Sequence, residues 1–79
     1  MSREEVVECV KKSISEIMDI PISEIDTSES LKDLGANSID RMDIIVMAVE
    51  EVGVKMQMME FAKLKNIDGI IDVLYQKVQ

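Results

Sequence analysis

The first apolar residues of the chain repeat every three or four positions. Between positions 3 and 18 this repeat is carried by Val6, Val10, Ile14 and Ile17. Charged and polar residues fill the positions between them, so the spacing predicts an amphipathic α-helix with one face toward a core. Cys9 falls at the edge of that face, and we expect it to pack there as a small apolar side chain.

The periodicity stops between residues 19 and 37, where Pro21, Gly35 and several serines and threonines are typical of a loop. A connection of this length is unusual in a small domain. Apolar residues recur along it, and we expect them to pin the loop across a helical core: Ile20, Ile22, Ile25, Leu31 and Leu34. Pinned loops that end at a helix start often carry function.

A second helix is predicted to follow the loop. It should begin at Asn37 or Ser38 and run to about Val52, ending before Gly53. Residues 58–64 have a weaker pattern that indicates a short helix.

The last helix has the clearest repeat, and Asn66 is a suitable N-cap in front of it. Its apolar positions follow 3–4 spacing: Ile67, Ile70, Ile71, Leu74 and Val78. The fold class predicted for residues 1–79 is therefore all-α, as a single domain. We expect a small bundle of three main helices plus one short helix, with a long loop between helices one and two.

The composition excludes several classes of function. The 79 residues include 16 acidic and 9 basic side chains, no histidine and one cysteine, giving a net charge of −7. These counts argue against a zinc site, a Cys/His or Ser/His catalytic pair, a disulfide framework and a nucleic-acid interface. No apolar run approaches the roughly 20 residues that span a bilayer, so no membrane insertion is expected. Acidic residues near the start are untypical of a secretion signal, and we expect a cytoplasmic monomer.

The second helix carries more apolar surface than one core requires. On a helical wheel its apolar side chains span about 220°, whereas a stripe of little more than about 100° covers a core. We assign the inner half to the core, as Ile45, Ala48, Val49 and Val52. The outer edge is an apolar stripe formed by Ile39, Met42 and Val46. Alternatively, the bundle buries this helix on nearly all sides.

Charged residues border the apolar stripe. Asp40 and Asp43 lie on the polar face of the second helix, and a flexible methionine among them suits an adaptable contact with a basic partner. Arg41 lies near the middle of the apolar arc, in the first turn, where its long side chain can reach past the helix end.

A serine stands at the start of the second helix. Asn37 is a strong N-cap, and Asp40 three residues later can close a variant of the capping box. If Asn37 caps the helix, the Ser38 hydroxyl is free in front of the positive helix end, where a phosphate ester is stabilised. The alternative is that Ser38 itself is the N-cap.

Over nearly its whole length, the chain resembles the acyl carrier protein family. The resemblance rests on the first helix and the long loop, and on the Ser38-Ile39-Asp40 start of the second helix. It also rests on Leu31, the Leu34-Gly35 pair, the Glu50-Glu51 helix end and the last helix from Ile67 to Leu74. The family motif usually has Asp before the serine and Leu after it, where this chain has Asn37 and Ile39.

The resemblance implies that Ser38 carries 4′-phosphopantetheine, attached by a phosphopantetheinyl transferase. The thiol of that arm would hold acyl intermediates as thioesters, and the second helix would be the main element recognised by partners. The chain would then be a carrier and not an enzyme. We expect the partner-binding residues to be Ile39, Asp40, Arg41, Met42, Asp43 and Val46.

The run from Gly35 to Arg41 is similar to discrete carriers of bacterial polyketide pathways. It is particularly similar to those that deliver an acetyl unit to a hydroxymethylglutaryl-synthase-like enzyme during β-branching. Further expected partners are an acyltransferase and a decarboxylating ketosynthase.

Three other interpretations are open. One is an acyl carrier protein of fatty-acid synthesis. Another is a cofactor-free helical module that binds a partner helix through the apolar stripe, in which Ser38 stays unmodified. An enzyme is the weakest, because its only candidate acid–base groups, such as Asp40 and Asp43, lie on a charged face expected to be solvated.

Overall fold

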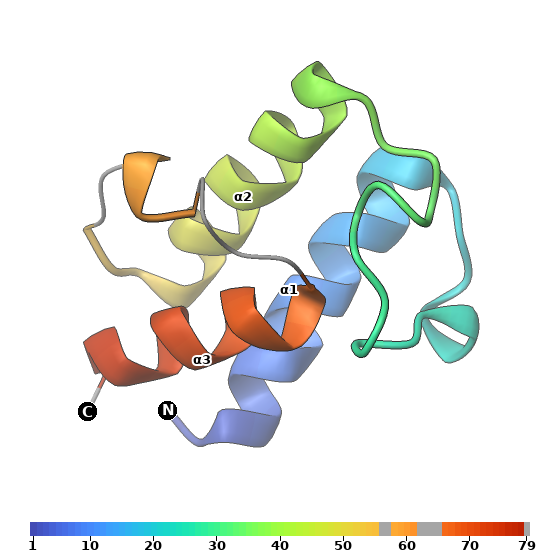
Figure 1. Cartoon of the computed structure of the whole chain (residues 1–79). Helices are drawn as coiled ribbons and strands as arrows, with labels where there is room; N and C mark the ends of the chain where they lie inside the picture. The colour runs from blue at the N-terminus through green and yellow to red at the C-terminus, as the bar shows by residue number, and fades with distance from the viewer. Residues whose placement is uncertain (56–57, 62–65, 79) are drawn as a thin grey trace.

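The computed structural model describes residues 1–55, 58–61 and 66–78. Within these residues the chain forms helices α1 (Arg3–Met18), α2 (Ser38–Val52) and α3 (Ile67–Val78) and the 3-10 turns η1 (Ile22–Glu24) and η2 (Met58–Phe61). Figure 1 shows α1 and α2 side by side and running in opposite directions, with α3 lying across them. The predicted all-α bundle is confirmed. The short element is a 3-10 turn, and residues 62–64 of its predicted range lie outside the described residues.

The core lies where the three helices meet. Its fully buried apolar side chains come from all of them: Val6, Val10, Ile14, Ile44, Ala48, Ile67, Ile71 and Leu74. Ser13 is also buried, and its hydroxyl donates to the carbonyl of Cys9 at 2.9 Å, so this buried polar group is paired. Cys9 is partly buried against this core, as predicted, and burial raises the pKa of its thiol.

Each helix begins at a side chain that satisfies a free backbone N–H. The Ser2 hydroxyl accepts from the N–H of Glu5, whose carboxylate accepts from the N–H of Ser2 at 3.0 Å. That backbone hydrogen bond lowers the pKa of Glu5. Asn66 accepts from the N–H of Gly69 at 2.9 Å, which confirms it as the cap of α3.

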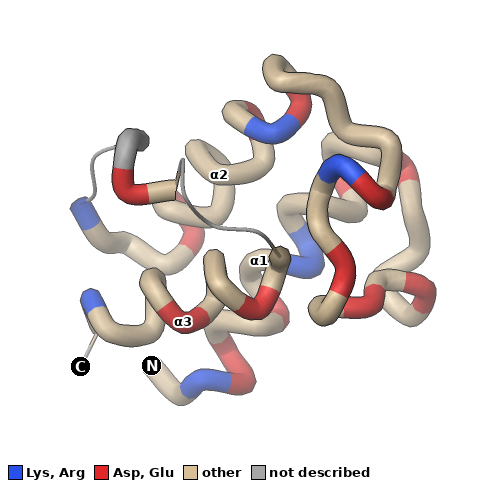
Figure 2. Tube along the Cα trace, in the orientation of Figure 1, with Lys and Arg blue, Asp and Glu red and all other residues tan. Residues whose placement is uncertain are grey.

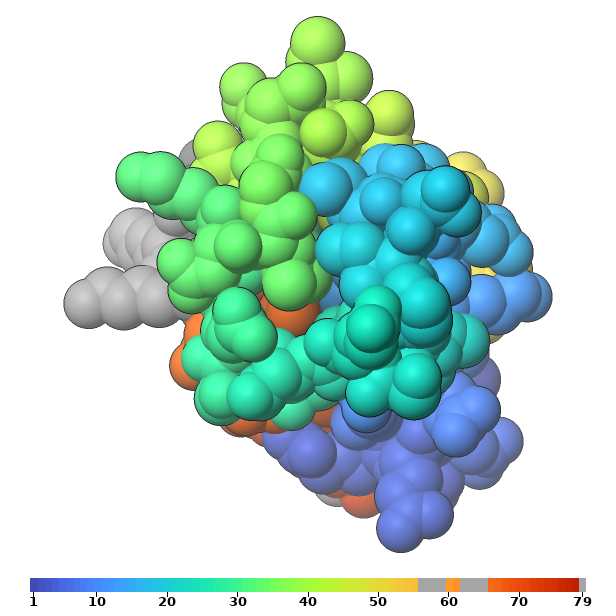
Figure 3. Space-filling view, turned by 90° about the vertical axis from the view of Figure 1, so that its right-hand side faces the viewer, coloured from blue at the N-terminus to red at the C-terminus, as the bar shows by residue number. Residues whose placement is uncertain are grey.

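The long loop is pinned at most of its apolar residues. Ile25 and Leu31 are buried, and Ile20 and Leu34 pack partly against the core. The prediction was wrong for Ile22, which is 47% exposed because η1 is a single turn with no buried residue. Figure 3 shows the loop, in teal and green, spread over one face of the molecule.

The loop is also tied to α3 through its backbone. The N–H groups of Ile67 and Asp68 donate to the carbonyls of Glu29 and Thr27, both at 2.9 Å. These are free donors of the first turn of α3, so the loop satisfies them in place of water. These hydrogen bonds hold the middle of the loop against α3, while η1 contacts α1.

Candidate functional site

The start of α2 is closed by a reciprocal capping box. The side-chain oxygen of Asn37 accepts from the N–H of Asp40 at 2.8 Å, and the Asp40 carboxylate accepts from the N–H of Asn37 at 3.3 Å. The N–H of Arg41 donates to the Asn37 carbonyl at 2.9 Å. Asn37 is therefore the N-cap, as predicted, and the alternative with Ser38 in that position is wrong.

Ser38 is the first residue of α2, and it is exposed. In the part of the chain that the structure describes, its hydroxyl has no hydrogen-bond partner, and the N–H groups of Ser38 and Ile39 have none either. These N–H groups and the helix dipole leave positive potential around a free hydroxyl. The arrangement fits a phosphate ester on Ser38.

The residues before the cap hold this serine in place. Gly35 has φ +90, a left-handed conformation that side chains rarely adopt, and it turns the chain toward the helix. The next residue, Ala36, is 6% exposed, and its N–H donates to the Leu31 carbonyl at 3.1 Å. Sequence reasoning did not single out Ala36. The feature of the sequence that could have indicated its burial is a small apolar residue between the glycine of the turn and the N-cap.

The apolar stripe of α2 is exposed. Ile39, Met42 and Val46 are 71%, 56% and 41% exposed, and the alternative of a helix buried on nearly all sides is wrong. The buried side of α2 consists of Ile44, Ile45, Ala48 and Val52.

The predicted core of α2 needs one correction. Ile44 is fully buried although it was not assigned to the core, and Val49 is only partly buried. On the helical wheel the four buried side chains of α2 span about 100°, with Ile44 at one edge of the arc and Ile45 at the other. This is the width expected for a helix that packs on one core. Val49 lies between this buried arc and the apolar stripe, so it is half covered.

The charged residues of α2 do not gather into one cluster. Asp40 is half-buried in the capping box, while Arg41 and Asp43 are exposed. Further along, Glu51 pairs with Lys12 of α1 at 3.6 Å. Figure 2 shows basic and acidic positions together in the first turn of α2. The charged face is solvated, as predicted, and in the described ranges no group of three or more acidic or Cys side chains could hold a metal ion.

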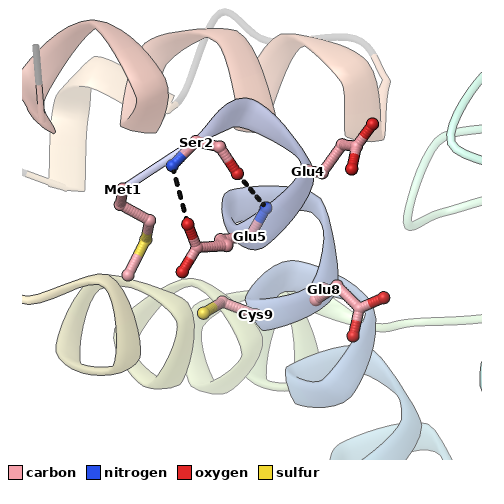
Figure 4. A pocket seen from close by; sticks show the side chains of 6 residues that line it. All are labelled: Met1, Ser2, Glu4, Glu5, Glu8 and Cys9. Atoms are coloured by element: carbon pink, nitrogen blue, oxygen red, sulfur yellow. Dashed lines mark hydrogen bonds between the residues drawn. The ribbon is translucent and has the colours of Figure 1, made fainter.

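A surface pocket lies elsewhere, around the N-terminal end of α1. It has a volume of about 410 Å³ and is lined by Met1, Ser2, Glu4, Glu5, Glu8 and Cys9. Figure 4 shows that its polar contacts are the capping box of Ser2 and Glu5, while Glu4 and Glu8 point away from them. The pocket belongs to the end of α1 and not to the start of α2.

Comparison with known proteins identifies the family. The sequence model of the family described as "Phosphopantetheine attachment site" matches residues 8–74. The chain belongs to the acyl carrier protein family. It is 32% identical to the polyketide biosynthesis acyl-carrier-protein AcpK of Bacillus subtilis, over all of this chain and 98% of the relative. It is 31% identical to an acyl carrier protein of Thermotoga maritima, over 98% of this chain and 96% of the relative.

Family membership decides the broad class of activity. An acyl carrier protein is a carrier and not an enzyme, and its prosthetic group is covalently bound 4′-phosphopantetheine. It works with a phosphopantetheinyl transferase and with synthase enzymes. In the described part of this chain, the helices are too short or too polar to cross a membrane.

The cap gives a first testable prediction. Asn37→Ala removes the acceptor of the Asp40 N–H, so we expect unfolding in urea to cost about 0.5–2 kcal/mol less than in the parent. Asn37→Asp keeps an equivalent acceptor and should stay close to the parent. Equal stability of all three proteins would show that the capping box contributes nothing.

Proposed function

We propose that this acyl carrier protein holds acyl intermediates as thioesters on a 4′-phosphopantetheine arm attached to Ser38, in polyketide biosynthesis. The attachment point is supported by one observation above all. Ser38 is an exposed serine whose hydroxyl is left free because Asn37 caps the helix. The pathway is supported by the similarity to the polyketide carrier of Bacillus subtilis. The expected compartment is still the cytoplasm.

The chain's own residues act by presenting the serine and the arm. In the transfer, the Ser38 oxygen forms a bond to the pantetheine-side phosphorus of coenzyme A and the P–O bond of the pyrophosphate breaks. Adenosine 3′,5′-bisphosphate leaves, and the serine hydroxyl loses its proton. The arm supplies the thiol that carries the acyl group. The free N–H groups of Ser38 and Ile39 face the new negative charge. The apolar stripe beside the arm then gives partner enzymes a surface to bind.

Intact mass spectrometry tests this proposal. The protein is incubated with coenzyme A, magnesium and a broad-specificity phosphopantetheinyl transferase. We expect a gain of one phosphopantetheine, which peptide fragmentation places on Ser38. No gain in a folded sample, repeated with a second transferase, would favour the cofactor-free module. A gain on another residue would overturn the assignment of Ser38.

A finer role is part of the proposal: delivery of acetyl units to a hydroxymethylglutaryl-synthase-like enzyme for β-branching. It is supported by the similarity of the run Gly35 to Arg41 to such donor carriers. The acetyl form is mixed with an enzyme of this class. The acetyl group should pass from the arm to a nucleophile of the enzyme, and the sulfur that stays on the arm should become a free thiol. An acetylated fatty-acid acyl carrier is the control. Equal consumption of both would remove the support for a dedicated donor.

The apolar stripe gives a second testable prediction. Met42→Asp places a charge on a side chain that we expect partners to bury, so kcat/KM of the transferase should fall about tenfold, or about 1.4 kcal/mol. Ile22→Asp is the matched control, because Ile22 is an exposed isoleucine outside α2. Both variants should unfold at the same urea concentration as the parent. An equal fall in both would mean that the effect is one of charge alone.

A further inference from the structure

Arg41 is an exposed cation without an ion pair among residues 1–55, 58–61 and 66–78. Three other basic residues are paired across elements, at 2.7 to 3.6 Å: Arg3 with Asp72, Lys12 with Glu51 and Lys77 with Glu60. Within the described ranges Lys11, Lys32 and Lys55 have no ion pair either. Arg41 differs from them because it stands in the first turn of α2, three residues after Ser38.

The helix brings no carboxylate to Arg41. Side chains three and four positions apart meet on a helix surface, and the neighbours of Arg41 at these spacings are Asn37, Ser38, Ile44 and Ile45. Asp40 and Asp43 are one and two positions away, so they face other directions. The carboxylate of Asp40 is moreover committed to the N–H of Asn37.

Helix geometry also directs the arginine toward the serine. Side chains on a helix lean toward its N-terminus, so Arg41 extends over the turn that contains Ser38. On the wheel Ser38 lies between Arg41 and Met42, each about 40–60° away. A group attached to Ser38 therefore leaves the helix between a cation and the apolar stripe.

We propose that Arg41 pairs with the phosphodiester on Ser38 and thereby holds the prosthetic arm against the first turn of α2. This inference rests on the proposed attachment at Ser38. The phosphodiester brings one negative charge to a place beside a guanidinium that has no ion pair among the described residues. Arg41 is then a positioning residue: it restricts where the arm begins, beside the apolar stripe that partners bind. Because the pair is exposed, salt weakens it.

Nuclear magnetic resonance tests the pairing directly, because the chain contains only two arginines. The Nε–H resonances of Arg3 and Arg41 are compared before and after modification, at about 20 mM and about 500 mM salt. We expect the Arg41 resonance to shift on modification and to return toward its starting position at high salt. Arg3, which is paired with Asp72, is the internal control and should not move on modification at either salt concentration.

Phosphorus resonance of the arm gives the second reading. Arg41→Gln should shift the phosphodiester resonance, Arg41→Lys should restore part of that shift, and Lys32→Gln, an exposed base of the loop, should have no effect. An Arg41 resonance that is unchanged by a confirmed modification would overturn the pairing and leave the proposed function intact. Absence of any modification in the mass spectrum would overturn both.

Discussion

Ser38→Ala is expected to take up no phosphopantetheine at all and to remain as stable as the parent. The loss should be complete because the substitution removes the only atom that can form the ester at the start of α2. Stability should be kept because Asn37, and not Ser38, supplies the cap. Alanine is also a good helix former, so the first turn of α2 has no reason to open.

The measurement combines intact mass with urea unfolding. Ser23→Ala is the matched control, since Ser23 is another exposed serine and lies in η1. We expect this control to gain one phosphopantetheine at the parental rate. Uptake by Ser38→Ala would contradict the assigned attachment point, whatever the fate of the control.

The stability half of this result separates the two possible roles of the serine. Replacing a serine that caps a helix with alanine lowers the free energy of unfolding by about 1 kcal/mol. We expect that cost for Asn37→Ala and not for Ser38→Ala, because the Asp40 N–H is bound to Asn37 at 2.8 Å. The pair of variants therefore tests both the cap and the free hydroxyl.

Local pattern was enough to predict the main helices. The bounds of α1 follow from 3–4 spacing, and those of α2 follow from Asn37 at one end and Gly53 at the other. Gly53 has φ +80 and ends the helix in the left-handed conformation that glycine adopts without strain. These features depend on residues close in sequence, and tertiary contacts do not change them.

Tertiary contacts decided what the pattern left open. The helical wheel of α2 gave the width of its apolar arc but not the direction of the core. Val49 was therefore assigned to the core in place of Ile44, which is the residue that is fully buried. In the long loop, Ile22 and Ile25 look alike in sequence, yet one is exposed and the other is buried. Loop residues have no period, and only the packing of the loop on the helices distinguishes them.

In the candidate site, too, local features could be predicted and features that depend on tertiary contacts could not. The position of Ser38 behind a capping asparagine could be predicted, because caps are local. The anchoring of Ala36 by the Leu31 carbonyl could not, because it depends on the path of the loop. The setting of Arg41 also needed the structure, which shows the residue exposed although its wheel position falls in the buried arc.

Leu74→Ala is expected to unfold a large fraction of the protein. Leu74 is fully buried in α3, and its truncation leaves a cavity that costs about 2–5 kcal/mol. A single core in a chain of this size rarely supplies more than about 3–5 kcal/mol. The variant should therefore unfold at a much lower urea concentration than the parent. Gln76→Ala, an exposed change on the same helix, should stay within about 0.5 kcal/mol.

The same variant should lose uptake of phosphopantetheine for a reason unlike that of Ser38→Ala. Ser38 is presented only when α2 is packed on α1 and α3, so uptake should fall with the folded fraction. Sucrose favours compact states, and it should restore both the fold and the uptake of Leu74→Ala. It should not restore uptake to Ser38→Ala, which is already folded. Uptake by an unfolded Leu74→Ala at the parental rate would show that the transferase needs only the local sequence around Ser38.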